Sequence, residues 1–301
     1  MDRLSLRARV MRACIRIVVK SSVGADPTVD LVRRRIALIS RLIPPPPRGT
    51  ETITLNAGGV QADRIATQSS RDDRYVLYLH GGSYVSGSPA LYRDLTWRLA
   101  TICRARVLCI NYRLAPEHPF PAALDDAVAA YRWLLAQGAR PRHVALMGDS
   151  AGGGLALATL LRLRDEGTPL PAAAAVVSPW TDLALTGESL QNNAPVDPMI
   201  PIKLAPRMVD LYLAGAEPHH PYASPLCGDP TGLPPTLIQV GGDEVLRDDA
   251  TRMAERMRAA GCQVEVGVWP RMWHGWHMLP RVMPEARAAL AHIARFMEDK
   301  L

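Results

Sequence analysis

A short glycine-rich stretch of the chain could supply a nucleophilic serine. Residues 148–153 read GDSAGG and place Ser150 in the pattern Gly-x-Ser-x-Gly. Gly148 and Gly152 suit a tight turn in which the backbone doubles back between a strand and a helix. That turn aims the serine hydroxyl at the helix N-terminus, whose dipole favours the negative charge that develops during attack. Because the pattern is short, a turn that only needs small residues is the alternative interpretation.

A serine hydroxyl is a poor nucleophile at neutral pH, so it needs a base and an acid that orients the base. The acid is expected at the end of a later strand. Asp243 directly follows the apolar run TLIQVGG, and Glu244, Asp248 and Asp249 come after it. Asp248 and Asp249 are expected to begin the next helix, where carboxylates suit the dipole. We therefore predict Asp243, which lies nearest the strand end, as the acid.

The base is expected after the last strand, in the stretch MWHGW. His274 precedes Gly275 in this loop, whereas His277 follows three residues later and is the alternative base. His292 falls in the predicted terminal helix, where a surface or packing role is expected. The resulting chain order of serine, acid and histidine is the order expected of an α/β-hydrolase.

A second glycine-rich segment could stabilise the oxyanion. The sequence HGGSY, residues 80–84, follows an earlier apolar run and places Gly81 and Gly82 in a loop. Glycines let backbone N–H groups approach a developing oxyanion, and the N–H of Ala151 would complete the set. His80 is expected to brace the loop rather than to react.

These residues require a particular order of strands and helices. Apolar runs of strand length are followed by helical patterns, and this alternation predicts an α/β fold with a mostly parallel sheet and helices on both faces. Strands are expected at 51–57, 60–67, 74–79, 106–111, 143–147, 173–178, 236–240 and 263–269, and helices near 90–103, 122–137, 150–165, 199–213, 247–260 and 284–298.

Two segments do not follow this alternation of strands and helices. Residues 1–20 read as an amphipathic basic helix with arginines between the apolar residues, and the run IPPPPRG at 43–49 ends the N-terminal helical region. Residues 182–225 form a long insertion rich in proline and polar residues. We expect residues 1–48 and this insertion to form a helical cap on a catalytic domain of residues 49–301. The basic helix packs on the protein body or lies on an anionic membrane surface.

Composition excludes several classes of protein. The chain has 301 residues, 48% of them hydrophobic, and a scattered net charge of +6, which is ordinary for a globular protein and does not favour nucleic acid as a partner. Five cysteines without metal-ligand spacing indicate reduced thiols, no structural metal and a cytoplasmic location. No segment predicts a signal peptide or a membrane span.

The last strand could present an open edge, so a homodimer is left open.

Together, the motifs HGGSY, NYRLAPEHPFPAALDDA, GDSAGG, SPWTDL, GGDEVLRDDA and MWHGW resemble the hormone-sensitive-lipase family of bacterial esterases over about residues 73–298. The resemblance implies an α/β-hydrolase fold with an eight-stranded sheet, a helical cap, and a carboxylic ester hydrolase that needs no cofactor. It also implies that Gly81 and Gly82 supply the oxyanion donors. One departure is Ser83, which replaces the third glycine of the family's HGGG box and predicts a narrower or more polar pocket.

The substrate is expected to be a small-molecule ester with a short to medium acyl chain, by resemblance to the family. Tyr84, Trp180 and the cap are expected to line its pocket, and Asp149 is expected beside the substrate, where it orients the surrounding loops. Two alternatives remain. The same triad could act on amides, lactones or arylformamides, or the fold could serve a non-catalytic small-molecule receptor, as in the plant gibberellin receptors.

Overall fold

The computed structural model of the protein describes residues 4–22 and 28–301. The predicted helix over residues 1–20 therefore begins outside the described residues, and its described part is α1 (Leu6–Ser22). Among the described residues, no helix combines the length and the apolar character needed to cross a membrane.

Eight strands form one sheet, in the order β1-β2-β4-β3-β5-β6-β7-β8. Strands β2 and β1 pair antiparallel with their neighbours, and the pairs from β4 to β8 are parallel. This arrangement confirms the predicted α/β fold. The strands are β1 (Glu51–Ala57), β2 (Val60–Ala66), β3 (Tyr75–Leu79), β4 (Arg106–Ile110), β5 (Val144–Asp149), β6 (Ala173–Val177), β7 (Thr236–Gly241) and β8 (Val264–Trp269).

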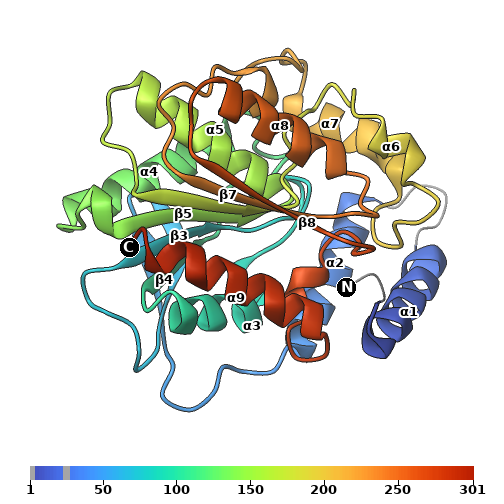
Figure 1. Ribbon diagram of the computed structural model, residues 1–301, viewed down its shortest axis with the longest axis horizontal. Coiled ribbons are helices and arrows are strands. Elements are labelled where there is room, and N and C mark those ends of the chain that lie inside the picture. The colour runs from blue at the N-terminus through green and yellow to red at the C-terminus, as the bar shows by residue number, and fades with distance from the viewer. Residues whose placement is uncertain (1–3, 23–27) are drawn as a thin grey trace.

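Helices cover both faces of the sheet (Figure 1). The α-helices after α1 are α2 (Val29–Leu42), α3 (Pro89–Ile102), α4 (Ala122–Ala136), α5 (Ala151–Asp165), α6 (Ser189–Asn192), α7 (Ala205–Leu213), α8 (Arg247–Ala259) and α9 (Pro284–Glu298). Helices α4, α5 and α8 pack on one face, and α3 and α9 pack on the other. The sequence pattern predicted one long helix near 199–213, whereas the structure has a 3₁₀ turn at Ile202–Leu204 followed by the shorter α7.

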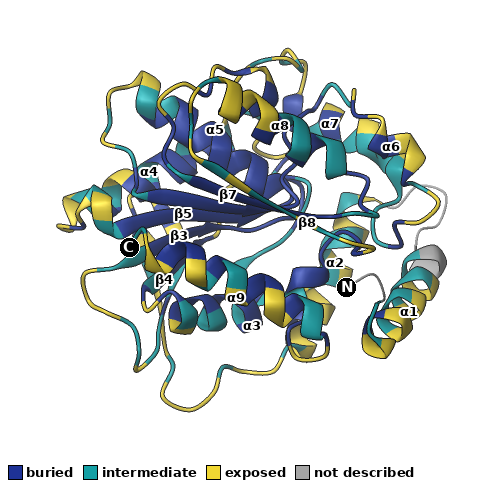
Figure 2. Cartoon of the chain, viewed as in Figure 1, coloured by how far each residue is buried: buried dark blue, intermediate teal, exposed yellow. Residues whose placement is uncertain are grey.

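Alternation along the strands produces two hydrophobic cores. Leu77 and Leu79 of β3 belong to the core under α4 and α5, whereas Val76 and Tyr78 belong to the core under α3 and α9. Successive side chains of a strand point to opposite faces, so a strand covered on both faces is apolar throughout. Figure 2 shows the resulting band of buried strands at the centre of the molecule. The buried sheet gives the loops at its carboxyl edge a rigid base.

Candidate functional site

Ser150 occupies the turn between β5 and α5 at the carboxyl end of the sheet. Its backbone has φ 53° and ψ −126°, a conformation that residues with a Cβ rarely adopt. The glycines on either side allow this turn to pack closely. A Cβ at Gly152 would lie 2.1 Å from the carbonyl oxygen of Leu79, and one at Gly148 would lie 2.3 Å from that of Gly152. The geometry is that of a strained strand-to-helix turn with the serine at its apex.

His274 is paired with Glu244. The imidazole lies in the loop after β8, and its Nδ1 is 3.0 Å from Oε2 of Glu244, whose side chain is fully buried. The other carboxylate oxygen accepts hydrogen bonds from the Ser178 hydroxyl at 2.7 Å and from the backbone N–H of Gly241. These contacts fix the carboxylate, and the carboxylate in turn orients the ring and leaves its Nε2 as the nitrogen that can accept a proton.

The environment of His274 favours its charged form. Burial lowers the pKa of His274, but the hydrogen bond and the charge of Glu244, together with the charges of Asp197 and Asp149, outweigh burial, so the pKa of His274 is raised above its ordinary value. The charge of His274 also acts on Asp149, the residue before the serine, and lowers the pKa of that carboxyl.

The structure corrects the predicted acid. Asp243 does not contact His274, and its carboxylate instead pairs with Arg12 of α1 at 2.5 Å. The physical reason is the shape of the turn after β7. The N–H of Asp243 donates to the carbonyl of Met272, and the N–H of Glu244 donates back to the carbonyl of Gly241, so that the side chain of residue 244 is the one that faces the buried loop.

One sequence signal could have found Glu244. It is the carboxylate that directly precedes the apolar pair Val245 and Leu246, both of which are buried, whereas the neighbouring Asp243 remains partly exposed. Distance from the strand end, the criterion that favoured Asp243, says nothing about how the turn rotates successive side chains.

The alternative base, His277, is buried away from Glu244. Its Nε2 lies 3.7 Å from Oδ2 of Asp149, beyond hydrogen-bond distance, and neither ring nitrogen has a hydrogen-bond partner among the described residues. Burial, with the nearby charge of His274, lowers the pKa of His277 to about 3, so the ring is neutral. His80 is also buried, and its ring stacks on Tyr112 with centroids 4.3 Å apart, consistent with the predicted bracing role.

The loop of residues 80–84 lies directly beside the serine. A Cβ at Gly81 would be 3.0 Å from Cβ of Ser150. The N–H of Gly81, however, already donates to the Tyr92 hydroxyl at 2.9 Å and to Oδ1 of Asp149 at 3.1 Å. The prediction of Gly81 as an oxyanion donor is therefore wrong, because its donor is committed to bracing the loop.

Three other backbone donors at this loop and the serine turn remain available. No described residue accepts a hydrogen bond from the N–H of Gly82, Ser83 or Ala151. Ser83 has φ 54°, and this left-handed backbone turns the loop where the third glycine of the family's box would stand. The replacement of that glycine thus preserves a backbone N–H at the same position.

Asp149 holds the loop to the serine turn. Its carboxylate accepts hydrogen bonds from the hydroxyls of Tyr78 at 2.7 Å and Tyr92 at 2.8 Å, in addition to the N–H of Gly81. Burial raises the pKa of Asp149 to about 6 despite these bonds. Since both carboxylate oxygens are engaged within the protein, the structure assigns Asp149 to the predicted orienting role and not to direct contact with substrate.

Tyr84 and Trp180 lie together in a buried aromatic group beneath α7. The Tyr84 ring stacks on Tyr212 of α7 with centroids 3.7 Å apart, and Trp180 lies 6.3 Å from Tyr84. The hydroxyl of Tyr84 and the backbone carbonyl of Trp180 also approach Gly154 in the first turn of α5, where a Cβ would lie 3.1 and 2.0 Å from their oxygens. Their contact with a substrate stays a prediction, because both are almost fully buried.

Two arginines that sequence reasoning did not single out attach the N-terminal helices to this site. Arg12 of α1 reaches Asp243 and the carbonyl of Val196 in the insertion. Arg33 of α2 donates to the carbonyl of Val85, which follows the oxyanion loop, and pairs with Glu117. Helix α1 therefore contacts the loop that follows β7, and α2 contacts the glycine-rich loop that follows β3.

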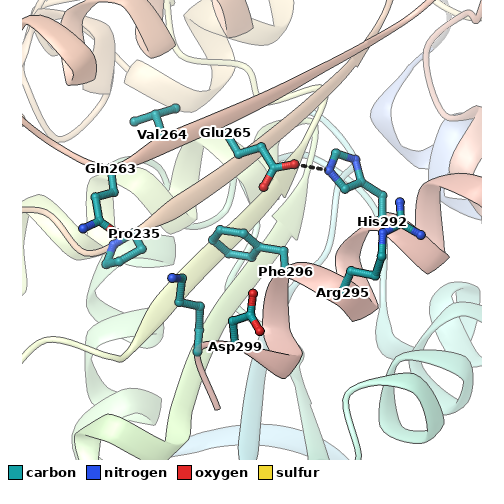
Figure 3. A pocket seen from close by; sticks show the side chains of 9 residues that line it. Pro235, Gln263, Val264, Glu265, His292, Arg295, Phe296 and Asp299 are labelled. Carbon is teal, nitrogen blue, oxygen red and sulfur yellow. Dashed lines mark hydrogen bonds and ion pairs between the residues drawn. The ribbon is translucent and has the colours of Figure 1, made fainter.

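A separate hollow of about 380 Å³ lies between β8 and α9 (Figure 3). It is lined by Pro235, Gln263, Val264, Glu265, His292, Arg295, Phe296, Asp299 and Lys300. Pro235 immediately precedes β7, so this hollow lies at the amino end of the strands, opposite to the end that carries Ser150. His292 is paired there with Glu265, in keeping with its predicted surface or packing role.

Comparison with known proteins agrees with this fold. The sequence profile of a family with the alpha/beta hydrolase fold matches residues 76–278. An acetyl-hydrolase of Streptomyces hygroscopicus is 51% identical over 227 residues, which span 75% of this chain and 76% of that protein. An esterase of Acinetobacter venetianus is 37% identical over 259 residues, which span 86% of this chain and 85% of that protein.

Solved structures extend the likeness to the whole chain. The crystal structure of an esterase from the bacterial hormone-sensitive lipase family superposes with a TM-score of 0.94 at 42% identity, and covers 100% of this chain and 99% of that one. Fold and site thus define an α/β-hydrolase enzyme of the carboxylesterase class. The chain belongs to the hormone-sensitive-lipase family of bacterial esterases.

Proposed function

We propose that the protein hydrolyses carboxylic esters with short to medium acyl chains, using Ser150 as nucleophile, His274 as base and Glu244 as the acid. The observation that carries this proposal is the pairing of His274 with the buried Glu244 at the same end of the sheet as the strained Ser150 turn. The names of the similar proteins, an esterase and an acetyl-hydrolase, support an ester substrate with a small acyl group.

The first half of the reaction forms an acyl-enzyme. Oγ of Ser150 attacks the ester carbonyl carbon while Nε2 of His274 takes the hydroxyl proton. The negative charge moves to the carbonyl oxygen, where the N–H groups of Gly82, Ser83 and Ala151 receive it. Each such donor is worth on the order of 3 kcal/mol of transition-state stabilisation. The intermediate collapses when the carbon–oxygen bond to the alcohol breaks and His274 returns its proton to the leaving oxygen.

The second half releases the acid. Water attacks the acyl carbon of the ester on Ser150, His274 takes a proton from that water, and the same backbone donors hold the second oxyanion. When the bond to Oγ breaks, the proton passes from His274 to Ser150, and the carboxylic acid leaves. Glu244 keeps the imidazole in one tautomer and stabilises its charged form in both halves.

A series of p-nitrophenyl esters of increasing acyl length tests the reaction and its substrate range. The wild-type protein is expected to give a burst of p-nitrophenol equal to the enzyme concentration, with highest kcat/KM for short to medium chains. Ser150→Ala is expected to remove the burst. An active-site phosphonate should label the wild-type protein at Ser150 and leave Ser150→Ala unlabelled.

Two results would contradict the proposal. Near-full activity of Ser150→Ala would show that another group performs the attack. Binding of a p-nitrophenyl ester that the protein does not hydrolyse, together with no labelling of Ser150 by the phosphonate, would favour the receptor alternative. Amide, lactone and arylformamide substrates belong in the same panel, because they differ in leaving-group basicity while requiring the same three side chains.

A further inference from the structure

Helix α1 uses one face to cover the acid and base loops. Ala8 is fully buried on this inner face, and Met11 and Ile15 pack against the core under α9. Arg12 pairs with Asp243, and its guanidinium lies over the Trp273 ring at 5.8 Å. The helix thus touches the immediate sequence neighbours of both Glu244 and His274, so its position and the geometry of the proposed site are linked.

The opposite face of α1 is apolar and exposed. Leu6, Val10 and Ile17 are 67%, 53% and 69% exposed, and Cys14 between them is also exposed. At 100° per residue, Leu6, Val10 and Ile17 fall within an arc of about 40° on the helix. An amphipathic helix of a globular protein normally turns such a stripe toward the core. In this protein the opposite side of α1 packs against the core, and the apolar stripe is exposed to solvent (Figure 2). We term this stripe the outer face of α1.

Positive charge flanks the outer face. The α1 sequence contains no aspartate or glutamate, and its exposed Arg7 and Arg9 form no ion pair with any described residue. Helix α2 repeats the pattern, since Leu38 and Leu42 are exposed and Arg34 and Arg41 remain exposed. Figure 1 shows α1 and α2 at the same end of the molecule. The cap therefore combines exposed apolar residues with unpaired arginines.

We propose that the outer face of α1 docks on an anionic phospholipid bilayer and so holds the enzyme at a surface that carries acyl esters. The proposal rests on the proposed esterase function for its substrate class. A single apolar stripe flanked by arginines matches the boundary between lipid headgroups and acyl chains, where apolar side chains enter and cations meet phosphate. The complete lack of acidic residues in α1 makes the charge complementary to such a surface along the whole helix.

Co-sedimentation with vesicles tests docking independently of hydrolysis. The Ser150→Ala protein is mixed with vesicles of phosphatidylglycerol and phosphatidylcholine in equal parts, and with vesicles of phosphatidylcholine alone. Binding is expected to the anionic vesicles and to weaken with salt. Arg7→Gln with Arg9→Gln should lower the partition coefficient about 25-fold, at about fivefold for each arginine near the surface. Val10→Gln with Ile17→Gln should lower it comparably.

A matched control separates the helix from the general surface. Ile53→Gln removes another exposed apolar side chain, on β1 far from α1 in sequence, and should leave vesicle binding unchanged. All of these changes, made in the protein with Ser150, should preserve kcat/KM for a soluble p-nitrophenyl ester. In the α1 variants, the rate of hydrolysis of a medium-chain ester held in anionic vesicles should fall in parallel with vesicle binding. In Ile53→Gln this rate should stay unchanged.

The outcomes are distinct. Absence of binding to anionic vesicles, or binding that the α1 variants do not change, overturns the proposal. A self-association that Val10→Gln with Ile17→Gln abolishes, without vesicle binding, also overturns it and assigns the outer face to a second copy of the chain. Vesicle binding by a protein that hydrolyses no soluble ester would support docking while contradicting the proposed esterase function.

Discussion

The carboxylate of Glu244 lies 3.0 Å from Nδ1 of His274, while Asp243, one residue earlier, points away to Arg12. Glu244→Gln is expected to lower kcat by about three to four orders of magnitude, the effect of placing an amide behind a catalytic imidazole. Asp243→Asn should change kcat by no more than a few fold. Steady-state kinetics with a soluble ester measure both, and the opposite ranking would restore Asp243 as the acid.

The two histidines after β8 should behave differently. His274→Ala removes the proposed base and should lower kcat by several orders of magnitude. His277→Leu replaces a buried neutral ring whose nitrogens have no hydrogen-bond partner among the described residues, so kcat should stay within a few fold. The comparison requires circular dichroism of both variants to establish that they are folded. A larger loss in His277→Leu would reverse the assignment.

The pH dependence of activity follows from His274. Its folded-state pKa is raised, so the imidazole binds a proton at a higher pH than an ordinary histidine and must lose it to act as base. We expect kcat/KM to fall as the pH is lowered through this raised pKa. Glu244→Gln removes the charge that raises it, so the residual activity should persist to lower pH. An unchanged profile in Glu244→Gln would show that another group titrates.

Asp149 should make stability depend on pH. Its pKa is raised by burial from 3.8 to about 6, so the folded state binds a proton more tightly than the unfolded chain. The contribution of this carboxyl to the free energy of unfolding is fully present below pH 3.8 and is lost as the pH rises toward 6. The loss amounts to roughly 2 to 3 kcal/mol, at about 1.4 kcal/mol per pKa unit. Urea unfolding at several pH values should show this slope in the wild-type protein and its loss in Asp149→Asn.

Asp149→Ala tests the bracing of the oxyanion loop. The substitution leaves the hydroxyls of Tyr78 and Tyr92 and the N–H of Gly81 without their shared acceptor. An unpaired buried donor costs about 1–3 kcal/mol, so the variant should lose at least about 2 kcal/mol of unfolding free energy. Its kcat should fall more than that of Asp149→Asn, which keeps one oxygen for the loop. Equal kcat in the two variants would contradict the bracing role.

The edge strand β8 predicts a homodimer. It pairs with β7 on one side, and Val268 is exposed on it. An unprotected edge strand can pair with a second copy. Sedimentation velocity should detect a dimer, and Val268→Lys should shift it toward monomer while Ile53→Lys, on β1, should not. A monomeric wild-type protein would contradict this prediction.

Much of the fold follows from local sequence patterns. The sequence predicted all eight strands to within about two residues. Strands β3 to β7 read as apolar runs because they are buried on both faces of the sheet, whereas β1, β2 and β8 are partly exposed. The turn around Ser150 was predictable because close backbone contact leaves no room for a Cβ at Gly148 or Gly152. Helix α7 was less predictable, since its segment lies in the insertion, where contacts with the domain decide the helix start.

The details of the site depended on tertiary contacts. Sequence alone placed a carboxylate after β7 and glycines after β3, because the chain order and the composition of the loops require them. It did not decide between Asp243 and Glu244, since that choice depends on how the turn rotates against Met272. Sequence also did not reveal that the N–H of Gly81 donates to Asp149 and Tyr92. Sequence determines which groups reach the carboxyl edge of the sheet, and tertiary packing decides which of their donors and acceptors remain free for chemistry.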